Sequence, residues 1–323
     1  MKAYMFTDQG PAIRETPNLP PKANQVSVKV HASALNRIDL VMAQGAPHGS
    51  RGGVGTVLGS EWAGEVVEIG PDVTEVAVGD RVMGATGSAF ADYVTAHVAN
   101  VLKIPDPEMG YETAACFPIA LRTMHDAIVT AGQFHAGQTV LIQGASSGVG
   151  LLGLQIAKVL GAKMVIGSST DPGRRGRLGE FGCDQVIDSS DLGWPEQVLE
   201  YTQGQGVDLV VDQVSGLLVN GNMRATKVGG RVVNVGRLGG QRAEFNADLH
   251  ALRQITYVGV TFRTRTLEEI GAINSLMVDD LWEAFNAGKL TIPIDSAFPF
   301  AEVDQALGRM QRNQHFGKIV LRH

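Results

Sequence analysis

Apolar and polar positions follow two different patterns along the chain, and the change between them falls near residue 120. Before it, short alternating or apolar runs are separated by Gly, Pro, Asp and Asn, which is typical of a strand-rich module. Strands are predicted there at residues 26–30, 64–69, 81–83 and 93–95. After it, short apolar runs alternate with longer helical patterns.

The middle of the chain predicts a parallel, doubly wound α/β sheet, because alternating strands and helices form βαβ units. The expected strands are residues 139–143, 163–166, 185–187, 208–212, 231–235 and 255–260, and the expected helices are 149–160, 174–181, 194–202 and 217–226. The tail predicts a helix at 267–287, a run at 292–297, a short helix from about 301 and a strand at 318–321. Another crossover would be needed to extend the parallel sheet, so we expect the tail to pack on the first module.

Residues 144–150, Gly-Ala-Ser-Ser-Gly-Val-Gly, join the first strand of this sheet to its first helix. Small side chains let the backbone approach a pyrophosphate, and the helix N-terminus attracts the anion. The loop departs from a strict GxGxxG motif, because Ala and Ser stand where the first two glycines would be. We interpret the loop as a dinucleotide cradle, with cofactor contacts predicted at Ala145, Ser146, Ser147, Gly148, Val149 and Gly150.

The end of the second strand decides between NAD and NADP, because an acidic side chain there binds the ribose hydroxyl and repels a 2′-phosphate. Ser168 and Ser169 end this strand, and Arg174 follows within two helical turns. Hydroxyl and guanidinium groups suit a phosphate, so we predict NADPH as the cofactor, with Arg174 as the preferred phosphate partner. Asp171 leaves NADH open, because a shift of one or two residues would place its carboxylate on the ribose.

Composition narrows the class of protein. The chain has 27 Lys and Arg against 33 Asp and Glu, a net charge of −6 that gives no basic footprint for nucleic acid. No apolar run is long enough to span a membrane, and the N-terminus does not have the pattern of a secretory leader. The two cysteines, Cys116 and Cys183, cannot make a disulfide framework, which favours a reducing, cytoplasmic location.

With these features the sequence resembles the zinc-independent quinone oxidoreductase (zeta-crystallin-like) branch of the medium-chain dehydrogenase/reductase superfamily. The segments that carry the resemblance are residues 137–158, 36–39, 59–64, 78–82, 206–212, 230–236 and 317–321. The resemblance implies a GroES-like catalytic domain formed by residues 1–120 and 263–323, and a Rossmann domain at 121–262. It also implies a homodimer or homotetramer, joined through the last Rossmann strand.

The superfamily divides on zinc, and this chain lacks the zinc pattern. Zinc alcohol dehydrogenases carry Gly-His-Glu where this chain has Gly59-Ser60-Glu61, and a cysteine ligand in the region of Asn36. A structural zinc would need four clustered cysteines. We therefore predict no metal, and hydride transfer to a quinone or an α,β-unsaturated carbonyl compound in place of alcohol oxidation. The alternatives are an enoyl-thioester reductase and a cofactor-binding protein with little turnover.

The resemblance also implies site residues outside the loop. Asn36 would donate its amide to a substrate oxygen, or cap a helix; Thr123 would lie against the nicotinamide, or be an ordinary helix residue. Arg263 is a candidate because it follows the last predicted Rossmann strand, where it would bind substrate oxygen or seal the dimer edge. Further cofactor contacts are predicted at Val235, Gly236, Asn313, Gly317 and Lys318. The proton donor stays open: a tyrosine common in relatives is missing, and His48 is more simply a surface histidine.

Overall fold

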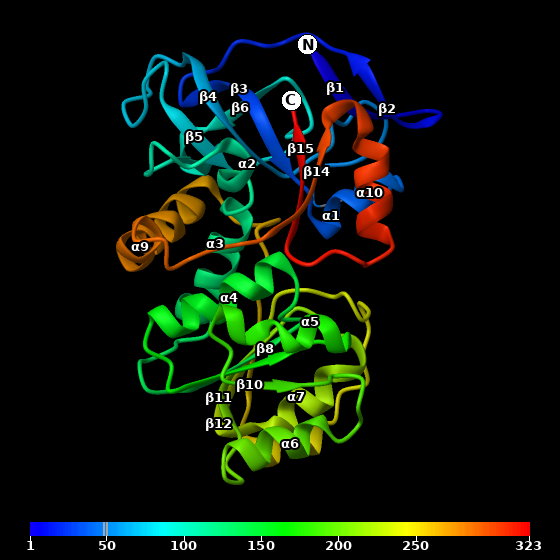
Figure 1. Ribbon diagram of the computed structural model, residues 1–323, viewed down its shortest axis with the longest axis vertical. Helices are drawn as coiled ribbons and strands as arrows, with labels where there is room; N and C mark the ends of the chain where they lie inside the picture. The colour runs from blue at the N-terminus through cyan, green and yellow to red at the C-terminus, as the bar shows by residue number, and fades with distance from the viewer. Residues whose placement is uncertain (48, 50) are drawn as a thin grey trace. The chain divides into compact units, whose positions relative to one another are not determined.

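The computed structural model describes residues 1–47, 49 and 51–323, and the chain divides into two compact units (Figure 1). The first unit comprises Met1–Ile119, Phe262–Ser275 and Ile292–His323, and the second comprises Ala120–Thr261 and Leu276–Thr291. Residues 276–291 therefore belong with the second unit, although we expected them with the first. The reason lies in helix α9 (Leu267–Asn286), whose Asp280 accepts a hydrogen bond from buried His125 of the second unit.

The first unit is built on a mostly antiparallel sheet with the strand order β14-β15-β3-β4-β5-β7, and β6 also pairs with β3. Its strands are β3 (Gln25–Ala34), β4 (Glu61–Ile69), β5 (Arg81–Gly84), β6 (Tyr93–His97), β7 (Val101–Lys103), β14 (Ile294–Pro299) and β15 (Lys318–Arg322). A separate hairpin joins β1 (Lys2–Thr7) to β2 (Gly10–Glu15). The helices are α1 (Arg37–Ala43), α2 (Tyr111–Ala114) and α10 (Val303–Gln311), with short η1 (Val98–Asn100) and η5 (Phe300–Glu302).

The two ends of the chain meet in this sheet. In Figure 1 the red strand β15 lies beside the blue strand β3, and the two pair antiparallel with Val320 opposite Ala34. Ile319, Val320 and Leu321 are fully buried, so burial of apolar surface holds the tail in place. The expectation that the tail packs on the first module is confirmed for residues 292–323 and is wrong for residues 276–291.

The second unit contains a parallel sheet with the order β10-β9-β8-β11-β12-β13. Its strands are β8 (Thr139–Gln143), β9 (Met164–Ser168), β10 (Gln185–Ile187), β11 (Val207–Asp212), β12 (Thr226–Asn234) and β13 (Thr256–Gly259). Strand β8 lies between β9 and β11, so the chain reverses direction across the sheet there. The predicted doubly wound fold is confirmed, and ligands bind such sheets at this reversal, outside the carboxyl ends of the strands.

Helices of the second unit precede these strands or connect them. They are α3 (Pro118–His125, which begins in the first unit), the π-helix η2 (Asp126–Thr130), α4 (Gly148–Val159), α5 (Pro172–Gly176), η3 (Leu178–Phe181), α6 (Trp194–Tyr201), η4 (Gly216–Leu218), α7 (Val219–Ala225) and α8 (Ala247–Arg253). The single helix predicted at 174–181 is wrong: α5 and η3 are separate pieces. Gly176 and Gly179 weaken a helix at that place, because glycine loses more backbone freedom than other residues on folding.

Candidate functional site

The predicted site residues fall into two groups, one in each unit, and the first group surrounds the loop between β8 and α4. Gly144 has a φ of +71°, which few other residues adopt without strain. A Cβ atom on Gly150 would lie 2.6 Å from the carbonyl oxygen of Gly144 and 2.7 Å from the Cα of Ala145. Glycine is required at both positions, and the loop backbone packs tightly against the first turn of α4, as a phosphate cradle needs.

Ser147 has a local role that explains why it replaces the expected glycine. It is the N-cap of α4, and its Oγ accepts a hydrogen bond from the backbone N–H of Gly150 at 3.0 Å. A serine cap stabilises a helix start by about 1 kcal/mol relative to alanine. Ala145 is fully buried, and its N–H donates to the carbonyl oxygen of Ser168 at 2.9 Å. Its side chain therefore faces the protein interior.

The predicted phosphate-selective residues lie where β9 ends. Ser168 is fully buried, and its Oγ accepts a hydrogen bond from the N–H of Gly144 at 2.9 Å, so this hydroxyl supports the loop from behind. The Oγ of Ser169 donates to the Oγ of Ser146 at 3.1 Å, which joins the end of β9 to the cradle. Whether these hydroxyls bind a phosphate stays a prediction.

Asp171, which left NADH open, is engaged in starting helix α5. Its Oδ1 accepts the backbone N–H of Arg174 at 2.8 Å and lies 3.7 Å from the Nε of the same arginine. The hydrogen bond from Arg174 holds the pKa of the Asp171 carboxyl below its ordinary value. Arg175 donates to the carbonyl oxygen of Ser169 and forms a 2.9 Å ion pair with Asp188.

A buried polar network at the ends of β8 and β11 was missed by sequence reasoning. Asp212 is fully buried; its Oδ1 accepts two backbone N–H groups at 2.8 Å, and its Oδ2 accepts the Nδ2 of Asn222 at 2.8 Å. Burial raises the pKa of Asp212 despite these donors. The N–H groups of the predicted Val235 and Gly236 lie 2.7 and 3.1 Å from the Asp212 carbonyl oxygen. The sequence did contain one indication of this network: β8 ends in a polar residue, Gln143, and β11 ends in Asp212.

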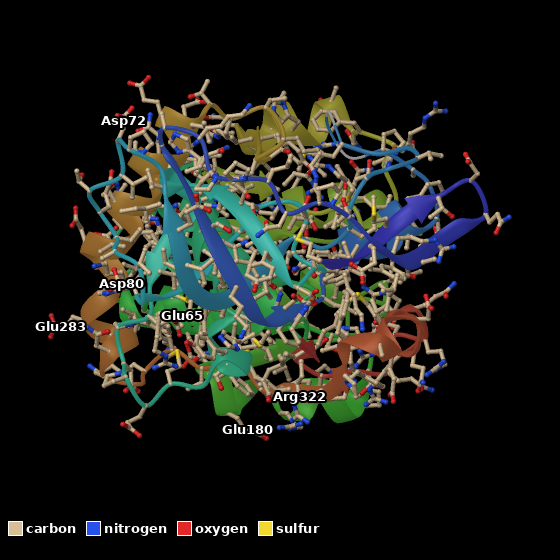
Figure 2. The ribbon with its side chains drawn as sticks, turned by 90° about the horizontal axis from the view of Figure 1, so that it is seen from above. Glu65, Asp72, Asp80, Glu180, Glu283 and Arg322 are labelled. Carbon is tan, nitrogen blue, oxygen red and sulfur yellow. The ribbon has the colours of Figure 1, made fainter. Side chains whose placement is uncertain are left out.

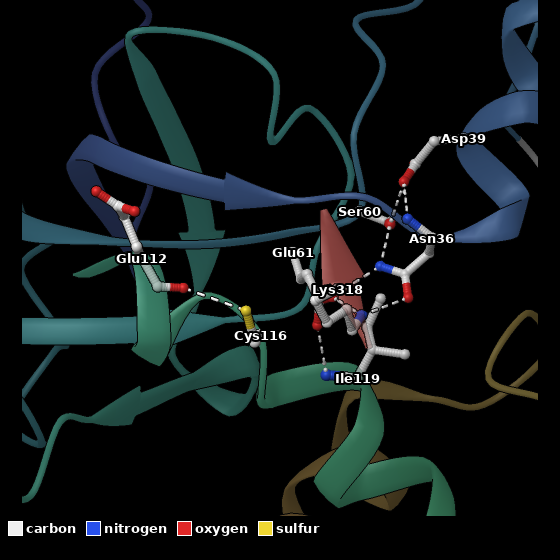
Figure 3. A network of polar contacts seen from close by, with 8 residues as sticks. All are labelled: Asn36, Asp39, Ser60, Glu61, Glu112, Cys116, Ile119 and Lys318. Carbon is white, nitrogen blue, oxygen red and sulfur yellow. Dashed lines mark hydrogen bonds and ion pairs between the residues drawn. The ribbon is translucent and has the colours of Figure 1, made fainter. Parts of the chain in front are cut away.

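The second group of predicted residues lies in the first unit and centres on Asn36 (Figure 3). The Asn36 Nδ2 donates to the Oγ of Ser60 at 3.2 Å and to the Oε1 of Glu61 at 2.8 Å. Its Oδ1 accepts from the Nζ of Lys318 at 2.8 Å. The amide is thus fully engaged inside the protein, and its predicted contact with a substrate oxygen would require one of these bonds to open.

Glu61 and Lys318 form a buried ion pair within this cluster, with side-chain exposures of 0% and 4%. The other carboxylate oxygen of Glu61, Oε2, accepts the backbone N–H of Ile119 at 2.9 Å. Burial raises the pKa of Glu61, and the nearby ammonium group opposes that shift. The sequence suggested Lys318 as a phosphate contact, whereas this structure holds its ammonium group against Glu61. Gly317 is required before it, because a Cβ there would lie 2.1 Å from the carbonyl oxygen of Pro293.

Asp39, one helical turn after Asn36, closes the cluster. Its Oδ2 accepts the backbone N–H of Asn36 at 2.7 Å and the hydroxyl of Ser60 at 3.1 Å. Its Oδ1 is buried and has no hydrogen-bond partner among the described residues. Burial is the main cause that raises the pKa of Asp39 to about 7.

The structure locates the remaining predicted residues, and their roles stay predictions. Thr123 is half-buried on α3, Arg263 is exposed after β13, and Asn313, with a φ of +55°, accepts a hydrogen bond from Arg37. His48 lies outside the described residues. Within residues 1–47, 49 and 51–323 there is no group of three or more His, Cys, Asp and Glu that could hold a metal ion. No helix in the same part of the chain is long and apolar enough to span a membrane.

Comparison with known proteins agrees with the two kinds of sheet described above. Residues 22–106 match the alcohol dehydrogenase GroES-like domain, and residues 148–277 match the family described as zinc-binding dehydrogenase. One polypeptide of the phenolphthiocerol/phthiocerol polyketide synthase of Mycobacterium tuberculosis is 30% identical over 301 residues. The match covers 93% of this chain but only 14% of the synthase polypeptide.

Several solved structures match the chain over its whole length, among them a quinone oxidoreductase and a protein in complex with NADPH. A quinone oxidoreductase from Pseudomonas syringae pv. Tomato DC3000 has 25% identity and a TM-score of 0.88, with 99% of that chain covered. The mycobacterial protein Rv1454c, in complex with NADPH, has 25% identity and a TM-score of 0.87, with all of that chain covered.

Together with the GroES-like sheet and the parallel sheet described above, these matches establish the class of protein. The chain belongs to the medium-chain dehydrogenase/reductase superfamily. Within it, the chain belongs to the zinc-independent branch, alongside quinone oxidoreductases.

Proposed function

We propose that this protein is a zinc-free, NADPH-dependent reductase of quinones or α,β-unsaturated carbonyl compounds. The observation that carries the proposal is the cluster at Asn36, Ser60 and Glu61. Its polar groups are the Asn36 amide, the Ser60 hydroxyl and the Glu61 carboxylate, which is already paired with the Lys318 ammonium group. These are not the thiolates and imidazoles of a catalytic zinc site. A substrate activated by its own conjugation does not need a Lewis acid, and this suits a quinone or an enone.

The loop between β8 and α4 would hold the cofactor. The tight packing of Gly150 on the loop backbone leaves the first turn of α4 to face a pyrophosphate, and the helix dipole favours that anion. Arg174 would bind the 2′-phosphate, because it lies in the first turn of helix α5, just after the end of β9, and the Asp171 carboxylate beside it is engaged as the cap of that helix. When bound, the cofactor supplies the hydride.

Steady-state kinetics test this proposal. We expect loss of NADPH absorbance with 1,4-benzoquinone or 9,10-phenanthrenequinone, a higher KM for NADH, and no effect of a metal chelator. Quenching of protein fluorescence by NADPH without turnover of any quinone or enone would refute it, and would favour a cofactor-binding protein. Tighter use of NADH would refute the NADPH assignment.

Reduction of an α,β-unsaturated thioester is a second candidate, and the match to a polyketide synthase favours it. The same hydride acceptor, a carbon conjugated to a carbonyl group, occurs in both substrate classes. Comparing kcat/KM for crotonyl-coenzyme A with that for a simple enone distinguishes them. A preference of more than about tenfold for the thioester, equal to 1.4 kcal/mol, would favour this candidate.

We also propose self-association as a homodimer or homotetramer through strand β13. This strand is at the edge of its sheet, and nearby Phe245 and Leu252 are 47% and 68% exposed. An exposed sheet edge offers unpaired backbone groups to a second strand. Light scattering at micromolar concentration tests it, and a monomeric mass would refute it.

A further inference from the structure

A buried carboxyl group lies behind the hydroxyl of Ser60, and the mechanism proposed so far does not use it. Asp39 is 0% exposed, whereas Ser60 is partly exposed. The hydroxyl of Ser60 donates to Asp39 Oδ2 at 3.1 Å and accepts from the Nδ2 of Asn36 at 3.2 Å. Asp39, Ser60 and Asn36 therefore form a continuous hydrogen-bonded chain, drawn in Figure 3.

Capping of helix α1 explains the contacts of only one of the two Asp39 carboxyl oxygens. Its Oδ2 binds the N–H of Asn36, as a capping residue does, but a cap needs neither complete burial nor a second oxygen without a donor. Asp80 shows the ordinary case. Its Oδ2 likewise accepts the N–H of a residue three positions earlier, Ala77 at 2.9 Å, but it is 30% exposed and paired with Lys103.

We propose that Asp39 holds a proton and delivers it through Ser60 to the substrate oxygen during reduction. This inference rests on the proposed reductase function and names the proton donor that the missing tyrosine leaves open. Ser60 is the catalytic residue, because its hydroxyl would touch the substrate, and Asp39 acts through it. Asn36 positions the Ser60 oxygen by its hydrogen bond.

The step balances in atoms and charge. When bound, the cofactor would supply a hydride, which would form a C–H bond at the β-carbon of an enone or an O–H bond at one oxygen of a quinone. The displaced π-electron pair would move to the carbonyl oxygen of the enone or to the second oxygen of the quinone. The Ser60 hydroxyl, which donates to Asp39 Oδ2 in this structure, would first turn to the substrate oxygen. That oxygen would then take the Ser60 proton while the Ser60 Oγ takes a proton from Oδ2 of the protonated Asp39. The products are an enol or quinol, an Asp39 carboxylate and oxidised cofactor. Solvent then returns a proton to Asp39.

The groups around Asp39 allow this role at neutral pH. Burial raises the pKa of Asp39 to about 7, with Glu61 adding to the shift and Lys318 opposing it. The half-buried Arg51 is a further charged group that interacts with the Asp39 carboxylate. Because the donor must be protonated, kcat is highest below this pKa and falls as the pH rises through it.

The test compares pH profiles of kcat with 1,4-benzoquinone for the wild type, Asp39→Asn and Ser60→Ala. Asparagine keeps an acceptor for the Asn36 N–H but cannot donate a titrating proton. We expect both variants to lose about a hundredfold in kcat, together with the fall above neutral pH. The Kd for NADPH, from fluorescence quenching, should stay within twofold and shows that the variants are folded. Ser60→Thr, which keeps a hydroxyl, should restore the pH-dependent fall.

Asp80→Asn is the matched control, because it alters a carboxylate with the same capping geometry (Figure 2 labels Asp80), and its profile should equal that of the wild type. An Asp39→Asn variant with wild-type kcat and an unchanged fall would overturn the inference. Absence of turnover by the wild type would instead overturn the proposed function. Infrared titration tests the protonation of Asp39 independently of turnover, and so separates failure of this inference from failure of the proposed function. A carboxyl band that disappears near neutral pH and is missing from Asp39→Asn supports proton storage, and its absence from the wild type overturns it.

Discussion

Replacing Lys318 with methionine should destabilise the protein in a way that depends on pH. The substitution keeps much of the apolar stem and removes only the ammonium group from a pair whose partners are 4% and 0% exposed. Removing one partner of a buried pair costs about 3–5 kcal/mol, because the other charge stays buried alone. Glu61 retains hydrogen bonds from Asn36 and Ile119, so we expect about 3 kcal/mol.

The direction of the pH effect follows from Glu61. Burial already raises the pKa of its carboxyl group above the ordinary value of 4.5, and loss of the ammonium group raises it further. Protonated Glu61 carries no charge, so the stability is present below the ordinary pKa and is lost as the pH rises through the raised one. The penalty of Lys318→Met should therefore be smaller at about pH 5 than at about pH 8.

Urea unfolding followed by tryptophan fluorescence measures this difference, since Trp62 lies in the core of the same unit. Adding Glu61→Gln to Lys318→Met removes both charges and should recover part of the loss. Lys103→Met is the control: it breaks an exposed pair with Asp80, which should cost less than about 1 kcal/mol. A loss below about 1 kcal/mol for Lys318→Met, or an equal loss at both pH values, would refute the reasoning.

Two further predictions concern the cofactor. Gly150→Ala should weaken NADPH binding by at least about tenfold and destabilise the fold by about 1–3 kcal/mol, because the new Cβ would lie 2.6 Å from the Gly144 carbonyl oxygen. Fluorescence titration measures it against Gly176→Ala, where a Cβ meets no atom within 4 Å, and wild-type binding by Gly150→Ala would contradict it. Arg174→Ala should raise the KM for NADPH by about tenfold and leave that for NADH unchanged. Arg177→Ala, which alters an exposed arginine paired with Glu180, is the control, and an equal rise for both cofactors would argue against a phosphate contact.

The parallel sheet and its glycine loop could be predicted because their signals are local. Strands β8 and β11 are short apolar runs, each followed by a turn, and burial on both faces is enough to produce such runs. The loop between β8 and α4 follows from the order of small residues over a few positions. The division of α9 between the two units could not be predicted, because it depends on the contact of Asp280 with His125, 155 residues earlier in the chain.

The contacts within the candidate site likewise join residues that are far apart in the sequence, so they could not be predicted. Sequence reasoning singled out Asn36 and Lys318 separately, and assigned one to the substrate and the other to a phosphate. The structure joins both to Glu61, which lies 257 residues before Lys318. No periodic pattern links residues so far apart, and their pairing depends on β15 lying against β3.

The sequence alone therefore determined the class of fold, the place of the glycine-rich loop between β8 and α4 and the lack of a zinc-ligand pattern in the residue order, since each depends on neighbouring residues. Only the tertiary structure decided what those residues can do. Burial changes the pKa of Asp39 and of Glu61, and close approach decides which donor each acceptor receives. Both are properties of the environment that distant segments create together, so neither can be read from one segment.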